Sequence, residues 1–136
     1  MLIVNTFVMV TKFKVNGVER NEPYVDYIKE QVNSNFPLWK EKYCVYNDKC
    51  NCNFGVGYKF NDVEIAFVKD RGSIELRITK DGVSPKNFSW ENDIHRGIIN
   101  SIPGINPKWY CAICKEVIDF YINLLKERID TFVWED

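Results

Sequence analysis

The sequence is poor in the groups that enzymes and nucleic-acid-binding proteins commonly use. It contains a single histidine, His95, and no Gly-rich loop that would cradle a phosphate group. Its 18 basic residues are balanced by 19 acidic ones. The chain therefore lacks the positive excess with which a general nucleic-acid binder displaces counterions from phosphates. These absences argue against an enzyme and against general nucleic-acid binding.

A long hydrophobic run is also missing. The most apolar segment, residues 2–10, is far too short to cross a bilayer. A secretory signal would carry basic residues before its apolar core, whereas Lys12 and Lys14 come after it. We interpret residues 2–15 as a buried first strand, and we expect no membrane association.

The cysteines do not form an even set. There are five of them, and an odd number without a secretory signal is more typical of a reducing cytosol than of a disulfide framework. We therefore predict a cytoplasmic protein. The length of 136 residues is that of one ordinary domain, and we assign residues 1–136 to it.

The clearest pattern in the chain is an alternation of apolar residues between about 54 and 80. Successive side chains of a strand point to opposite faces, so this alternation predicts a three-stranded meander with one buried face. A turn at Asn61-Asp62 and a second turn at residues 69–73 separate the strands. The alternating residues are Phe54, Val56, Tyr58, Phe60, Val63, Ile65, Phe67, Ile74, Leu76 and Ile78.

Three segments have helical spacing. Asn21 and Pro23 begin the first, which ends by Asn35 because a proline follows. Ser89 can cap the second, whose apolar stripe is Trp90, Ile94, Ile98 and Ile102. The third is predicted from Asn106 to about Arg128, with Ile113, Val117 and Leu124 packed on Ile65 and Leu76 of the meander.

Residues 36–53 show a weaker pattern. A short strand is predicted around Tyr43 and Val45, and an exposed polar loop at residues 47–53. Together these elements predict an α+β fold. Its sheet has four or five largely antiparallel strands, and the helices pack on one face.

The cysteines offer one alternative function. Cys111-Ala-Ile-Cys114 has the spacing of a zinc knuckle, and together with the other thiols and the histidine it supplies enough ligands for a tetrahedral site. Against zinc, both cysteines fall inside a predicted helix, where a buried free cysteine acts as a small hydrophobic residue. The alternative ligand set is Cys44, Cys50, Cys52, Cys111, Cys114 and His95.

Candidate contact residues come from the turn and the aromatics. The turn at residues 69–73 is polar and carries an arginine, although a glycine-containing tight turn would itself favour this composition. Four Trp, seven Tyr and nine Phe exceed what one core needs, and interfaces are enriched in Trp, Tyr and Arg. The predicted partner-binding residues are Lys69, Asp70, Arg71, Trp39, Trp90 and Trp134.

The segment from Val63 to Ile78, followed by a Trp-containing helix and a long final helix, resembles small bacterial immunity-type proteins. The resemblance implies a cytosolic α+β protein that neutralises a toxin or another effector. A phage- or mobile-element-encoded inhibitor of host defence would have the same features. We therefore predict a protein-binding inhibitor or immunity partner without a cofactor. The alternatives are a zinc- or small-ligand-binding protein and a homo-oligomeric structural protein.

Overall fold

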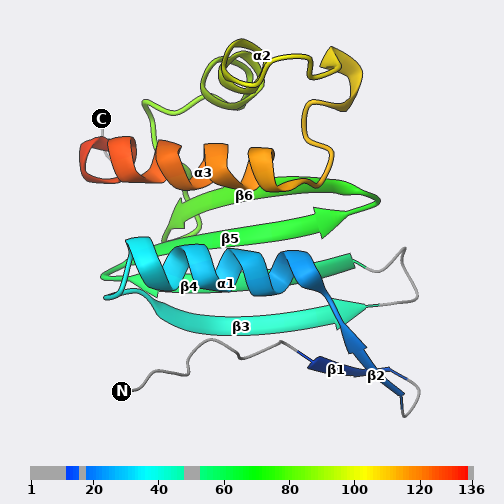
Figure 1. Ribbon diagram of the computed structural model, residues 1–136. Coiled ribbons are helices and arrows are strands. Elements are labelled where there is room, and N and C mark those ends of the chain that lie inside the picture. Colours follow the sequence, from blue (N-terminus) through cyan, green and yellow to red (C-terminus); the bar gives the residue numbers. More distant parts are fainter. Residues whose placement is uncertain (1–11, 16–17, 48–52, 135–136) are drawn as a thin grey trace.

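The computed structural model describes residues 12–15, 18–47 and 53–134. Its main sheet contains β3 (Lys40–Asn47), β4 (Asn53–Phe60), β5 (Val63–Asp70) and β6 (Ser73–Lys80). These strands are antiparallel neighbours in sequence order, so the predicted meander is confirmed and gains β3 as a fourth strand (Figure 1). The predicted strand around Tyr43 is therefore longer than expected, at eight residues.

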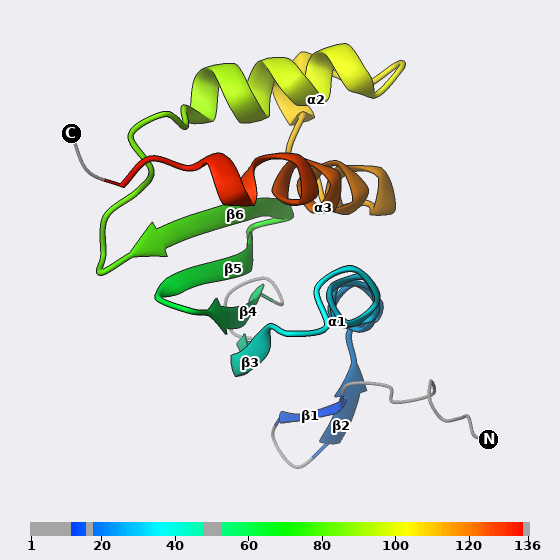
Figure 2. The same ribbon diagram turned by 90° about the vertical axis from the view of Figure 1, so that its left-hand side faces the viewer.

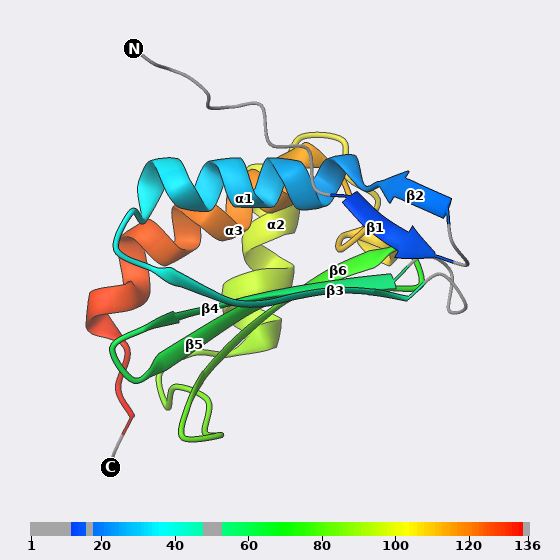
Figure 3. The same cartoon turned by 90° about the horizontal axis from the view of Figure 1, so that it is seen from below.

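The first predicted strand does not join this sheet in the described chain. Residues 2–11 of that prediction lie outside the described residues. β1 (Lys12–Val15) pairs with β2 (Val18–Asn21) in a separate antiparallel hairpin, at the end of α1 where that helix begins (Figure 3). Val15 is opposite Val18, which is the register of a hairpin with a two-residue connection.

The two longest helices cover one face of the main sheet. Figure 2 shows α1 (Pro23–Asn35) and α3 (Lys115–Arg128) on the same side, with α2 (Arg96–Ser101) beyond the β6 edge. The α+β fold with helices on one face is thus confirmed. Each strand turns alternate side chains toward the helices, and across the sheet Val56, Phe67 and Leu76 form one buried row.

The first helix forms largely as its sequence predicts. Pro23 occupies its first turn, where no intrahelical donor is lost, and the helix ends at Asn35. Its buried residues are Val25, Ile28 and Val32. The predicted cap at Asn21 is wrong, because Glu22 is the N-cap residue and its side chain makes no capping hydrogen bond.

The second predicted helix is divided into two parts. Ser89 caps it as expected, its hydroxyl accepting a hydrogen bond from the Asn92 N–H at 3.2 Å. A π-helical turn, η3 (Trp90–His95), precedes the short α2. Of the predicted apolar stripe, Ile94 and Ile98 are buried, whereas Trp90 at the start of η3 is exposed.

The third helix begins later than predicted. Residues 107–109 form a short 3₁₀ turn, η4 (Pro107–Trp109), and α3 starts only at Lys115. Between them the backbone pairs with the β5–β6 hairpin: Ile74 N–H donates to the Cys111 carbonyl at 2.8 Å, and Ile113 N–H donates to the Gly72 carbonyl at 3.0 Å. These long-range bonds take the backbone groups that a continuous helix would have used.

The buried face of α3 also differs from the predicted one. Leu124 and Ile113 are only partly buried, whereas Val117 is fully buried as predicted. The buried residues of the helix are Val117, Ile118, Tyr121, Ile122 and Leu125. Of two adjacent leucines, the sheet therefore buries Leu125 rather than Leu124.

Candidate functional site

The β5–β6 turn is a tight two-residue connection between Asp70 and Ser73. Arg71 and Gly72 both have positive φ, +56° and +86°, which is the geometry of the hairpin turns that match strand twist. Glycine adopts this backbone without a steric penalty, as the sequence predicts for Gly72. Arg71 adopts it as well, and its side chain is exposed at the tip.

A side chain from β4 holds this tip. The Asn53 carboxamide oxygen accepts a hydrogen bond from the Arg71 N–H at 2.9 Å, and its amide group donates to Asp70 Oδ1 at 3.2 Å. Asn53 is the last residue of the predicted loop 47–53, of which 48–52 lie outside the described residues. The hairpin tip and the end of that loop therefore lie at the same end of the sheet.

An aromatic surface lies beside the hairpin tip. We define it as Arg71, Trp90, Lys108, Trp109 and Tyr110, which line one hollow of about 420 Å³. Trp109 is 66% exposed and Trp90 is 36% exposed. Large aromatic side chains this exposed are uncommon outside binding surfaces, so the cluster is the best candidate site in the described chain.

Two of these aromatic side chains hold each other in place. The Trp90 indole N–H donates to the Tyr110 hydroxyl at 3.1 Å. The Tyr110 ring in turn stacks on the His95 ring, with centroids 4.1 Å apart and planes inclined by 27°. Burial is the main cause that raises the pKa of Tyr110. The surface is thus preformed by contacts between η3 and the segment that follows η4.

Cys111 is buried and lines the same hollow. The Tyr121 hydroxyl donates to the Ile74 carbonyl at 2.7 Å and lies 3.7 Å from the Cys111 sulfur. Burial raises the pKa of the Cys111 thiol, so it is protonated and a poor nucleophile near neutral pH. Cys111 therefore serves packing beneath the exposed aromatics.

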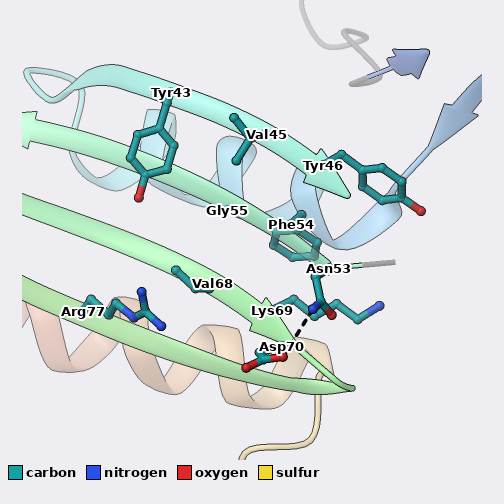
Figure 4. A pocket seen from close by; sticks show the side chains of 10 residues that line it. All are labelled: Tyr43, Val45, Tyr46, Asn53, Phe54, Gly55, Val68, Lys69, Asp70 and Arg77. Carbon is teal, nitrogen blue, oxygen red and sulfur yellow. Dashed lines mark hydrogen bonds between the residues drawn. The ribbon is translucent and has the colours of Figure 1, made fainter. Parts of the chain in front are cut away.

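A second hollow, of about 520 Å³, lies on the face of the sheet opposite α1 and α3. Figure 4 shows Val45, Gly55 and Val68 along it, with Tyr43 at one side and Arg77 at the other. Asp70 lines this hollow as well as the aromatic one. The β5–β6 tip is consequently a shared rim of two surface depressions.

The structure brings only some of the predicted contact residues together. Asp70, Arg71 and Trp90 share the aromatic hollow, and Lys69 lines the other one. Trp39 is 9% exposed and stacks on Phe36 at 4.0 Å, so it belongs to the core.

The remaining predicted tryptophan lies elsewhere. Trp134 is half-buried in the C-terminal segment, where the Lys80 ammonium lies 5.9 Å from its ring. Lys80 ends β6, whereas the hairpin tip precedes its first residue, so Trp134 lies away from the aromatic surface.

Sequence reasoning missed Lys108, Trp109 and Tyr110 as surface residues. It placed all three residues inside the helix that was predicted to start at Asn106. The Asn106 side chain does act as a cap, accepting from the Lys108 N–H at 2.9 Å, but what it caps is the short turn η4. The pairing of residues 111–113 with the hairpin depends on long-range contacts, which have no local sequence signal.

The alternative metal ligands are spread over the fold. Cys44 lies on edge strand β3, whereas Cys111 and Cys114 lie beyond β6, which is itself three strand spacings or roughly 14 Å from β3. Cys50 and Cys52 lie outside the described residues. Among the residues that are described, no group of three or more His, Cys, Asp or Glu side chains is placed to hold a metal ion.

Comparisons with known proteins add no family. No protein-family model matches the chain, and no curated protein sequence or solved structure matches it either. The resemblance to immunity-type proteins therefore stays a prediction. None of the helices in the described ranges has both the length and the apolar character needed to cross a membrane.

Proposed function

We propose that this chain is a cytoplasmic protein-binding module whose aromatic surface docks on a partner protein, which it inhibits or neutralises. The observation that carries the proposal is the 66% exposure of Trp109 beside Trp90 and Arg71 around one hollow. Trp, Tyr and Arg are the residue types that dominate binding energy at protein interfaces.

The scaffold of the surface supports the same function. Trp90 and Tyr110 are held by a mutual hydrogen bond and by the stacking of Tyr110 on His95. Arg71 projects from a turn that Asn53 fixes. A preformed surface loses little conformational entropy when it binds, which favours tight association. Loops and turns on a rigid sheet are also the usual carriers of recognition residues.

The direct test is quantitative affinity capture from the native host with three baits: the native protein, Trp109→Ala and Leu38→Ala. Leu38 is the matched control, because it is 78% exposed but lies at the opposite end of the sheet, next to the start of β3. We expect one partner to bind the native protein and Leu38→Ala equally, and Trp109→Ala at least about tenfold more weakly.

Both substitutions should leave the melting temperature nearly unchanged, since exposed side chains contribute little to stability. The captured protein is then assayed for its own activity or toxicity with and without an equimolar amount of this chain. Capture that does not depend on Trp109 would contradict the proposed binding surface. An unaltered activity of the captured protein would contradict inhibition while leaving the binding surface in place.

A further inference from the structure

We propose that the segment bound by the aromatic surface is acidic: its carboxylates pair with Arg71 and Lys108, and one of its apolar side chains packs on the Trp109 indole. This inference rests on the proposed function and specifies the chemistry of the partner. It follows from the charges and rings that the structure leaves unpaired around one hollow.

Two acidic side chains, Asp70 and Glu75, also line the hollow. Asp70 accepts a hydrogen bond from Asn53 at 3.2 Å, and Glu75 forms an ion pair with Arg77 at 3.2 Å. Arg71 and Lys108, by contrast, have no ion-pair partner among the described residues, although both line the hollow. The Asn53 amide is neutral, so Asp70 keeps its negative charge, but Arg71 and Lys108 together outweigh it. The net unpaired charge around this hollow is therefore positive, which favours a negatively charged partner.

The two cations differ in what they recognise. The Arg71 guanidinium offers a planar fork that binds a carboxylate through two parallel hydrogen bonds. Lys108 is a point charge that can follow a carboxylate of less defined orientation. The contact with Arg71 therefore sets the register of the bound segment. The contact with Lys108 adds attraction over a wider range of positions.

Trp109 supplies the apolar part of the site. Its indole has no ring contact and no hydrogen-bond partner within the part of the chain that the structure describes, and 66% of the residue is exposed. Trp90 and Tyr110 are engaged with each other and with His95. One free indole face suits a single apolar side chain, with the indole N–H left to bond the partner's backbone.

Single-stranded nucleic acid is the competing negative ligand. It requires several rings on which successive bases stack and a basic groove that follows the phosphates. Here one indole is free, and the chain has a net charge of −1. An acidic peptide segment therefore fits the described surface better than an oligonucleotide does.

The experiment uses a random 12-residue peptide library displayed on phage, selected on the intact native protein and counter-selected on Trp109→Ala. Enriched sequences are synthesised in pairs, one as selected and one with every Asp and Glu replaced by the corresponding amide. Affinities are measured for the native protein and for Arg71→Asn, Lys108→Gln and Lys59→Gln. Asn is chosen at position 71 because it tolerates the positive φ of that turn. Lys59 is an exposed control on β4, away from the hollow.

We expect the enriched peptides to carry net negative charge and at least one aromatic or large aliphatic residue. The amide versions, Arg71→Asn and Lys108→Gln should each bind at least fivefold more weakly, and Lys59→Gln should bind as the native protein does. Affinity should also fall as the salt concentration rises.

The outcomes separate the two proposals. This inference is overturned if the Trp109-dependent peptides are neutral or basic, or if their affinity is unchanged by Arg71→Asn and Lys108→Gln. Either result leaves protein binding intact. A failure to enrich any Trp109-dependent peptide contradicts the proposed function itself. Trp109-dependent binding of a 12-nucleotide oligothymidine that is tighter than that of every selected peptide would show that the acidic ligand is nucleic acid, and would overturn the inference.

Discussion

Asp93 joins η3 to the end of α3 on the α2 side of the fold. Its Oδ2 accepts a hydrogen bond from the Ser89 N–H at 2.6 Å, and its Oδ1 accepts one from the Arg128 guanidinium at 2.7 Å. Arg128 also donates to the Asn87 carbonyl at 2.9 Å. Partial burial alone would raise the pKa of Asp93, but the bonds from Ser89 and Arg128 outweigh it and lower the pKa.

The substitution Asp93→Asn should therefore destabilise the protein in a pH-dependent way. At pH 7 we expect a loss of about 1–3 kcal/mol, because a charged, partly buried hydrogen-bond acceptor is replaced by a neutral amide. The folded-state pKa is lowered, so the stabilisation is fully present above the unfolded-state value of about 3.9 and is lost as the pH falls through the lower folded value. Urea unfolding at pH 7 and at the lowest pH at which the native protein stays folded compares the free energy of unfolding with Asp93 charged and with it increasingly protonated.

Asp62→Asn is the matched control, because Asp62 is exposed in the β4–β5 turn. It should change the free energy of unfolding by no more than about 0.5 kcal/mol at pH 7. A cost of Asp93→Asn that is the same at both pH values would show that the carboxylate charge does not contribute.

Two adjacent leucines show how α3 is oriented in the fold. Leu125 is fully buried, whereas the adjacent Leu124 is only partly buried. Leu125→Ala should cost about 2–5 kcal/mol through lost burial and a residual cavity. Leu124→Ala should cost about 1 kcal/mol or less, as at partly exposed positions generally.

Urea unfolding of the two alanine variants compares identical chemical changes one residue apart. A cost for Leu124→Ala equal to or above that for Leu125→Ala would contradict the orientation of α3 on the sheet. It would instead support the predicted packing of Leu124 on the meander.

The close contact of α2 with α3 depends on Gly97. A Cβ atom at this position would lie 2.5 Å from Cζ of Phe120, well inside normal contact distance. In a helix, Gly→Ala otherwise gains up to about 1 kcal/mol from helix propensity. We expect Gly97→Ala to destabilise the protein by about 1–2 kcal/mol, because the clash costs more than the propensity gains.

A double-mutant cycle with Phe120→Ala isolates that contact. Once the ring is removed, Gly97→Ala should become neutral or stabilising, which gives a coupling of more than about 0.5 kcal/mol between the two sites. Additive effects of the two substitutions on the urea midpoint would show that the ring does not limit the approach of α2.

For the whole molecule, the two sheets should differ in stability. The four-stranded sheet shares one buried core with α1 and α3, whereas β1–β2 is a separate two-stranded hairpin. Such a hairpin has marginal stability by itself. We predict that its amides exchange with solvent through a local opening of lower free energy than the amides of β4, β5 and α3.

Hydrogen exchange followed by mass spectrometry on the intact chain gives this measurement. Peptides from β4 and β5 act as the internal reference for the global unfolding free energy. Equal protection of β1–β2 and the main sheet would contradict local opening and would indicate that the hairpin unfolds only with the core.

The parts of the fold that depend on local sequence patterns could be predicted from the sequence. Alternation of apolar residues specifies β4, β5 and β6, because side chains of a strand alternate between faces. Pro23 and the spacing of Val25 and Ile28 specify α1 in the same way. Gly72 specifies a turn through its backbone freedom. Fold class, meander and the placement of Asp70 and Arg71 at a tip all follow from such short-range rules.

The position of the site was decided only by the tertiary structure. Residues 111–113 have a helix-compatible sequence, yet their backbone groups bond to Gly72 and Ile74, some 40 residues earlier. Because of that pairing, α3 starts only at Lys115, and Trp109 is exposed beside Arg71. A hydrogen bond across such a separation depends on how the hairpin and α3 pack, and no local window of sequence contains this information. Local patterns thus determine the meander and α1, whereas packing determines where α3 starts and which aromatic side chains are exposed beside Arg71.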